Sequence, residues 1–141
     1  MKALSADHLL KISTAGIRKL AASETVAVLL PGTAFYLKAP HAPARKLLDA
    51  GAVVALSTDF NPGTCMTLNL PLIMTIGALY LGMTSAEILA AVTYSGAKAL
   101  DLHDRKGTLE PGMDADFAIH PFARFEKLYY RFGWAARAPG R

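Results

Sequence analysis

A chain of 141 residues with 52% hydrophobic and 18% charged residues can bury the core of a single domain, which excludes a mainly disordered protein. Its net charge of +4 is spread along the chain, so we expect neither a nucleic-acid partner nor a membrane attachment. The single cysteine, Cys65, excludes an internal disulfide and favours a cytoplasmic location. The N-terminus lacks the apolar region of a signal peptide, and the most apolar stretch, residues 68–83, is too short and too polar to span a membrane.

The first half of the chain predicts short strands that alternate with helices. Two of the expected strands are continuous apolar runs rich in β-branched residues, which is typical of strands covered on both faces. Strands and helices in this order with short links indicate right-handed βαβ units and a parallel sheet, an α/β fold. We expect strands over residues 2–8, over residues 25–32, where Pro31 and Gly32 stop the strand, and over residues 52–59. We expect helices over residues 13–23 and 44–51.

The pattern changes after Gly63. Residues 66–82 predict a loop that leads into an apolar helix. Thr84 and Glu87 have the spacing of a capping box, which predicts a further helix from there to about Leu102. The stretch "GTLEPGMDADFAIH", residues 107–120, predicts two short strands joined by a Pro-Gly turn.

Two residues that could take part in catalysis or metal binding follow expected strands. Asp59 ends the third expected strand, and His8 ends the first. Ligands of parallel α/β folds bind beyond the carboxyl ends of the strands, so both side chains point into one cleft if their strands are neighbours. There a carboxylate can bind a divalent metal or accept a proton from water, and an imidazole can polarise a carbonyl or transfer a proton. The structural alternatives are a helix cap or Asx turn for Asp59, and a cap of the following loop for His8.

The residues after Asp59 are typical of a turn. Asn61, Pro62 and Gly63 favour an ordinary turn as the first interpretation, and a main chain that binds substrate as the more specific one. The sequence has no HxH pair, HExxH motif, cysteine pair or Gly-rich phosphate loop. One carboxylate and one imidazole do not complete a catalytic zinc site, which usually takes three protein ligands.

Five segments taken together resemble the C-terminal third of the imidazolonepropionases, which belong to the metal-dependent amidohydrolase superfamily. The resemblance runs from about Leu4 to Gly133 in the same order and spacing. "TDFNPG" together with "LLPG…FYL" is specific to these enzymes, whereas "GTLEPG…AD" is shared by much of the superfamily. The segments are "SADHL" (5–9), "TVAVLLPGTAFYL" (25–37), "STDFNPGT" (57–64), "TLNLPLIMTIGAL" (67–79) and "GTLEPGMDADFAI" (107–119).

The resemblance implies the fold and the reaction. It implies the last three strands of a (β/α)₈ barrel, together with a short β segment of a small domain that is built from both chain ends. It further implies the hydrolysis of 4-imidazolone-5-propanoate to N-formimidoyl-glutamate in histidine degradation, with one zinc or iron ion.

The resemblance also implies roles for individual residues. Asp59 matches the metal-ligand Asp, which in this superfamily also takes a proton from the water and passes it to the leaving nitrogen. His8 matches a His that orients the water or polarises the ring carbonyl. Asn61 and Gly63 match positions that hold the substrate or product. Thr64 stands where the family usually has Ser and keeps the hydroxyl.

The resemblance leaves part of the family pattern outside the chain. The family's HxH ligands, a further ligand His and its nearby Glu would all lie upstream of Met1. We therefore expect a C-terminal fragment that is inactive alone, with a missing N-terminal piece or a second copy as its partner. We expect a partial barrel over residues 1–105, the β segment over residues 106–133, and an atypical tail over residues 134–141 that suggests a truncated or frameshifted end.

Two alternatives remain open from the sequence. The chain could belong to another cyclic-amide hydrolase or to a deaminase. It could also be a non-catalytic remnant or a module that docks onto a partner. The sequence between residues 1 and 141 does not decide among these.

Overall fold

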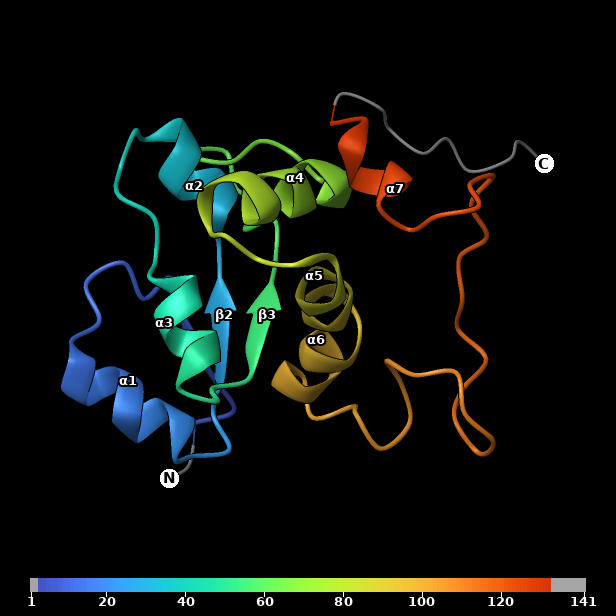
Figure 1. Ribbon diagram of the computed structural model, residues 1–141, viewed down its shortest axis with the longest axis horizontal. Helices are drawn as coiled ribbons and strands as arrows, with labels where there is room; N and C mark the ends of the chain where they lie inside the picture. The colour runs from blue at the N-terminus through green and yellow to red at the C-terminus, as the bar shows by residue number, and fades with distance from the viewer. Residues whose placement is uncertain (1–2, 133–141) are drawn as a thin grey trace.

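The computed structural model describes residues 3–132. A parallel three-stranded sheet lies at its centre, with the strand order β1-β2-β3 (Figure 1). The strands are β1 (Ser5–Asp7), β2 (Val26–Leu29) and β3 (Val54–Leu56). The predicted parallel sheet is confirmed, and the strands are shorter than the apolar runs that predicted them.

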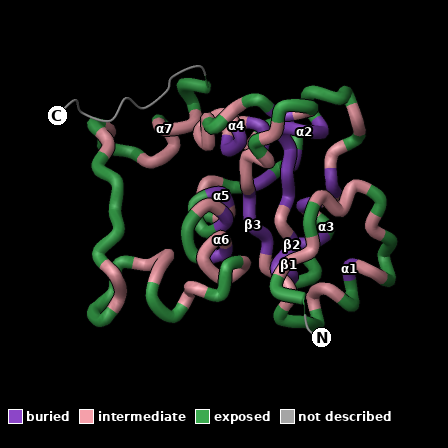
Figure 2. The backbone as a smooth tube through the Cα atoms, turned by 180° about the vertical axis from the view of Figure 1, so that it is seen from behind, coloured by how far each residue is buried: buried purple, intermediate pink, exposed green. Residues whose placement is uncertain are grey.

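The two helices expected between the strands are present. Helix α1 (Thr14–Ala21) follows β1, and the side chain of Ser13 caps it by accepting a hydrogen bond from the main-chain N–H of Gly16, at 3.1 Å. Helix α3 (Ala44–Asp49) leads into β3 and buries Leu47 completely. Both helices contribute buried side chains to the same core as β2 and β3. Figure 2 shows buried chain along β2 and β3 and mostly exposed chain along the outer side of α1.

One helix in the first half was not predicted. Helix α2 (Pro31–Tyr36) begins directly after β2. We interpreted Pro31 as the end of the strand, but proline also fits the first turn of a helix. An N–H at that position has no acceptor within the helix, so proline loses no hydrogen bond there. The polypeptide therefore turns from strand to helix without an intervening loop.

Between residues 70 and 99 the chain forms three helices where we predicted two. Helix α4 (Leu70–Tyr80) is the expected apolar helix, and α5 (Ser85–Val92) begins with the predicted capping box of Thr84 and Glu87. The helix expected to continue to Leu102 is interrupted at Thr93, whose φ of −122° and ψ of −95° lie outside the helical region. After the break, α6 (Tyr94–Ala99) lies beside α5 and contacts β2 and β3.

The two strands predicted over residues 107–120 do not form. The described part of this segment makes a turn, in which the N–H of Met113 donates to the carbonyl of Glu110, but no strand pairing. An isolated two-stranded hairpin is only marginally stable in water. Asp114 instead pairs with the preceding loop, through a 2.8 Å main-chain hydrogen bond to Arg105 and ion pairs with Arg105 and Lys106. The division into domains at residues 105 and 133 stays a prediction, and the tail at 134–141 lies outside the described residues.

The chain returns to the body at its last described helix, α7 (Lys127–Tyr130), which packs beside α4 in Figure 1. The hydroxyl of Thr75 in α4 donates to the main-chain oxygen of Tyr129 at 2.5 Å, and the Tyr129 hydroxyl lies 2.8 Å from that of Ser85. Two tertiary hydrogen bonds therefore hold α7 on the body.

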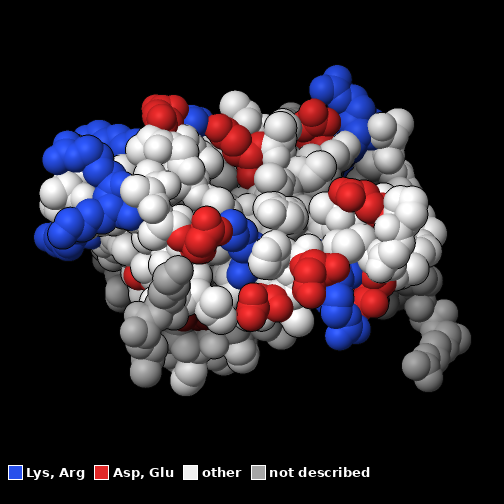
Figure 3. Space-filling model, turned by 90° about the horizontal axis from the view of Figure 1, so that it is seen from below, with Lys and Arg blue, Asp and Glu red and all other residues white. Residues whose placement is uncertain are grey.

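Figure 3 shows one face of the molecule, on which basic side chains gather along the left edge. Acidic side chains are scattered over the rest of this face, and several of them lie beside a basic side chain. Among residues 3–132 no helix is both long and apolar enough to cross a membrane.

Candidate functional site

The first candidate residue, His8, lies at the carboxyl end of β1. Its main-chain N–H continues the sheet by donating to the carbonyl of Val28 at 3.0 Å. His8 and Leu9 then adopt left-handed backbone conformations, with φ of 65° and 56°. Such conformations cost non-glycine residues about 1–2 kcal/mol each and often occur at functional sites. The turn directs the chain sharply away from the sheet at the point where the imidazole lies.

The second candidate residue, Asp59, follows the end of β3 and lies beside His8. Oδ2 of Asp59 lies 3.8 Å from Nε2 of His8, and it accepts a hydrogen bond of 2.6 Å from the hydroxyl of Thr33. Asp59 also has a left-handed conformation, with φ of 52°. The side chains of His8 and Asp59 are 44% and 26% exposed, so both remain open to a bound group. The structure thus brings together the two strand-end residues singled out in the sequence.

The loop after Asp59 is held together by the side chain of Asn61. Its amide oxygen accepts hydrogen bonds from the N–H of Gly63 at 2.9 Å, from the N–H of Thr64 at 2.7 Å and from the Thr64 hydroxyl at 3.1 Å. Its amide nitrogen donates to the main-chain oxygen of Asp59 at 2.7 Å. A short antiparallel bridge between Asn61 and Cys65 closes the loop. In this structure Asn61, Gly63 and Thr64 therefore bond to one another and to Asp59.

Thr33 is a site residue that we did not single out in the sequence. It lies in the first turn of α2, directly beyond the central strand β2, and it is 8% exposed. The only sequence signal was its position between "LLPG" and "FYL", where nothing pointed to a contact with Asp59. The contact depends on how closely α2 approaches the loop that follows β3.

Gly32 allows that approach. A Cβ atom at this position would lie 2.7 Å from Sγ of Cys65 and 2.8 Å from Cδ1 of Ile73, both closer than Cβ contacts occur in proteins. Burial first, and then the negative charge of Asp59, raise the pKa of the Cys65 thiol. Cys65 is thus a small buried contact of the site and not a reactive thiolate.

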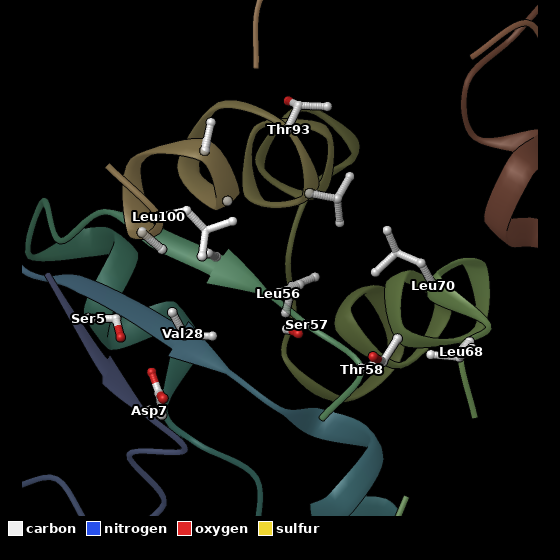
Figure 4. Close-up of a pocket in the computed structure, with 15 residues that line it drawn as sticks. Ser5, Asp7, Val28, Leu56, Ser57, Thr58, Leu68, Leu70, Thr93 and Leu100 are labelled. Carbon is white, nitrogen blue, oxygen red and sulfur yellow. The ribbon is translucent and has the colours of Figure 1, made fainter. Parts of the chain in front are cut away.

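A hollow of the described chain lies next to this site. It has a volume of about 620 Å³ and is bounded by one face of the sheet, by α6 and by the chain that leads into α4 (Figure 4). Its polar groups come from Ser5 and Asp7 of β1, from Ser57 and Thr58 after β3, and from Thr93. Neither His8 nor Asp59 lines it, although Thr58 directly precedes Asp59. The candidate site therefore lies at the strand ends and not inside this hollow.

The donor atoms of the site fit a metal ion in kind but not in number. A carboxylate and an imidazole are common ligands of zinc and of iron. Catalytic zinc usually takes three protein ligands, and the described residues contain no group of three His, Cys, Asp or Glu side chains that could hold an ion. His8 and Asp59 therefore provide at most part of a metal site, and the expected zinc or iron would need further ligands.

Comparison with known sequences identifies similar proteins. The sequence profile described as "Amidohydrolase family" matches residues 4–128. An imidazolonepropionase of Porphyromonas gingivalis is 50% identical over 130 residues, which make up 92% of this chain and 31% of the relative. Another, of Geobacillus sp. strain WCH70, is 51% identical over 131 residues, or 93% of this chain and 31% of the relative. The resemblance inferred from the motifs is confirmed, and the chain spans about a third of the length of these curated relatives.

A solved structure has a similar fold. It is an adenosine deaminase of Xanthomonas campestris with bound zinc, which is 27% identical and superposes with a TM-score of 0.75. The match covers 79% of this chain and 27% of that structure. The α/β arrangement of the present chain therefore corresponds to part of a larger hydrolase.

Proposed function

Because the chain belongs to the amidohydrolase family, we propose that it forms part of an imidazolonepropionase-type hydrolase. The reaction is the opening of the ring of 4-imidazolone-5-propanoate by water to give N-formimidoyl-glutamate, in histidine degradation. The observation that supports this proposal best is the 3.8 Å approach of His8 and Asp59 at the ends of two parallel strands. In this proposal the three strands are the last three of a (β/α)₈ barrel.

We propose that Asp59 transfers protons in this reaction. Its carboxylate accepts a proton from the attacking water and gives it to the ring nitrogen that leaves. Its partial exposure, 26% of the side chain, leaves room for this exchange. A positioned group that transfers protons accelerates such reactions by about 10²–10⁴-fold.

His8 has a complementary role in the proposal. Nε2 lies too far from Oδ2 of Asp59 for a direct hydrogen bond, at 3.8 Å, so the imidazole is free to donate to or accept from a third group. It orients the water or polarises the carbonyl of the substrate ring. The two side chains thus approach a reacting group from the ends of β1 and β3.

The loop of Asn61, Gly63 and Thr64 forms part of the proposed substrate site. Because the Asn61 side chain holds the loop, we propose that its second amide hydrogen and the Thr64 hydroxyl contact the polar substrate. Asp59 would also serve as one ligand of a zinc or iron ion whose other ligands lie outside residues 3–132. When bound, such an ion makes water acidic enough to ionise near neutral pH.

A chimeric enzyme tests this proposal. In the chimera, residues 4–132 replace the matching segment of the Porphyromonas gingivalis imidazolonepropionase. We expect ring opening of 4-imidazolone-5-propanoate by the chimera and a loss of at least about 10²-fold in kcat for Asp59→Asn. The exposed Asp104 provides a matched control, and Asp104→Asn should retain full activity. A folded, active chimera whose turnover is unaffected by Asp59→Asn would contradict the role given to Asp59.

A second hydrolase reaction is supported by the structural similarity to an adenosine deaminase. The same chimera, assayed with adenosine and with cyclic amides, separates this alternative from the first. Ring opening of the imidazolone at a kcat/KM far above that for the other substrates supports the leading proposal. The reverse order of kcat/KM favours the alternative.

The sheet itself supports a docking role as well. Both outer strands, β1 and β3, have one edge without a strand partner among the described residues. Such edges readily pair with another strand. We propose that the occupant is the remaining part of a barrel, provided by a separate N-terminal piece, with pairing to a second copy of this chain as the alternative. Size-exclusion chromatography with and without that piece tests this, and an unchanged elution volume for the chain with either partner counts against docking.

A further inference from the structure

The central strand contributes to the site through a residue that is neither a candidate ligand nor a candidate base. His8 follows β1 and Asp59 follows β3, whereas Thr33 follows β2, which lies between them. The Thr33 hydroxyl donates to Oδ2 of Asp59 at 2.6 Å, the short distance expected for a bond to a charged carboxylate. All three strand ends therefore meet at this carboxylate.

The contact constrains which way the Asp59 side chain points. Thr33 bonds the same oxygen, Oδ2, that lies nearest to His8, and no hydrogen bond from residues 3–132 reaches Oδ1. The main chain of Asp59 is held independently, since its carbonyl accepts the 2.7 Å hydrogen bond from Asn61. One contact thus holds the backbone in its left-handed conformation, and the other holds the side chain.

Burial of Thr33 fixes the position from which its hydroxyl donates to Asp59. Thr33 is 8% exposed, and a buried hydroxyl requires a hydrogen-bond partner. The close approach allowed by Gly32 keeps the first turn of α2 against the loop that follows β3. The hydroxyl therefore has a fixed donor position, whereas the exposed side of the carboxylate remains open.

We propose that Thr33 is a positioning residue, whose hydroxyl selects the Asp59 rotamer that turns Oδ2 toward His8 and leaves Oδ1 free for the reacting group. The catalytic effect of Thr33 rests on the proposed function, whereas its effect on the Asp59 rotamer can be tested separately. Thr33 itself touches no reacting atom. A contact in the second layer around a metal ligand changes metal affinity or activity by about 10–100-fold.

The test compares Thr33→Val with Thr33→Ser in the full chain. Valine keeps the shape of threonine and removes the hydroxyl, whereas serine keeps the hydroxyl and removes the methyl group. The first readout is the χ1 rotamer of Asp59, from three-bond couplings measured by NMR without metal. We expect a single rotamer in the parent chain and in Thr33→Ser, and rotamer averaging in Thr33→Val.

The second readout is the affinity of the chimera for zinc, measured by calorimetry, because the other proposed metal ligands lie outside residues 3–132. Thr33→Val should weaken it by about 10–100-fold, and Thr33→Ser by less than about 3-fold. If Thr33→Val does not fold, Thr33→Ala replaces it with the same expected results. An Asp59 rotamer that stays single without the hydroxyl would overturn the inference.

The two readouts distinguish the two proposals. If the chimera binds zinc no better than its Asp59→Asn variant does, the proposed metal role of Asp59 fails. The rotamer measurement still decides whether Thr33 positions the side chain, because it requires no metal. Zinc binding that depends on Asp59 but is equal in the Val and Ser variants would keep the proposed function and overturn the positioning role.

Discussion

Nε2 of His8 lies 3.8 Å from Oδ2 of Asp59, although β2 separates the two strands that carry these residues. The carboxyl ends of parallel strands lie at the same edge of a sheet. There the chain turns through a residue in the left-handed conformation, His8 after β1 and Asp59 after β3. The separation is longer than a hydrogen bond, so the two side chains approach each other without bonding directly.

The imidazole of His8 can be tested without disturbing this turn. Asparagine tolerates the left-handed conformation better than most residues, so His8→Asn removes the ring and preserves the backbone at φ 65°. In the chimera described above we expect kcat to fall by about 10²-fold or more with little change in the unfolding midpoint. His120→Asn is the matched control and should leave kcat unchanged. Equal kcat for both variants would exclude a catalytic role for His8.

The Asn61 side chain should determine the rigidity of the loop. Asn61→Ala removes the acceptor for Gly63 and Thr64 and the donor to Asp59, so we expect a loss of about 1–3 kcal/mol in the free energy of unfolding. Amide hydrogen exchange of Gly63 and Thr64 should become faster. Asn61→Asp keeps the acceptor oxygen and should leave the exchange of these two amides slow. Unchanged exchange in Asn61→Ala would show that the loop is held by other contacts.

Gly32 should be intolerant of any side chain. In Gly32→Ala the new methyl group would meet Sγ of Cys65 and Cδ1 of Ile73, and we expect a loss of about 1–3 kcal/mol in the free energy of unfolding. Cys65→Ala removes the less movable of the two obstacles. The double variant should therefore lose less stability than the sum of the single variants, by about 1 kcal/mol in a double-mutant cycle of urea denaturation. Strict additivity would mean that the Cys65 contact does not limit this position.

The bidentate ion pair between Arg45 and Glu87 should make stability depend on pH. Hydrogen bonds from Arg45, and then from the main chain of Thr84, lower the pKa of Glu87 from 4.5 to about 2. Because the pKa is lower in the folded chain, this contribution is complete above about pH 4.5 and is lost as the pH falls toward 2. Glu87→Gln keeps a capping side chain and removes the charge, so it should cost about 0.5–1 kcal/mol at pH 7, because solvent screens this partly exposed ion pair.

The measurement for Glu87 is the free energy of unfolding as a function of pH. The difference between the parent chain and Glu87→Gln should shrink between pH 4.5 and pH 2. Glu110→Gln, at an exposed position, is the control and should show no such difference. A constant difference across this range would show that the ion pair does not stabilise the fold.

Local patterns predicted much of the fold correctly. The apolar, β-branched runs predicted the strands β2 and β3, Ser13 predicted the start of α1, and Thr84 with Glu87 predicted the start of α5. These signals are local, because a run of apolar residues or a cap acts within a few residues along the chain. The hairpin at residues 107–120 failed because a strand needs a partner, which the local pattern cannot provide.

By itself, the sequence determined the three parallel strands with α1 and α3 between them, the family and the placement of His8 and Asp59 at strand ends, since strand ends and motifs are written in consecutive residues. Only the tertiary structure decided that Thr33 bonds Asp59, that Asn61 closes the loop around its carbonyl and that α5 and α6 are separate helices. The Thr33 contact, between residues 26 positions apart, depends on how closely α2 packs against the loop after β3. Packing of residues distant in the chain is a property of the whole core, and no short segment encodes it.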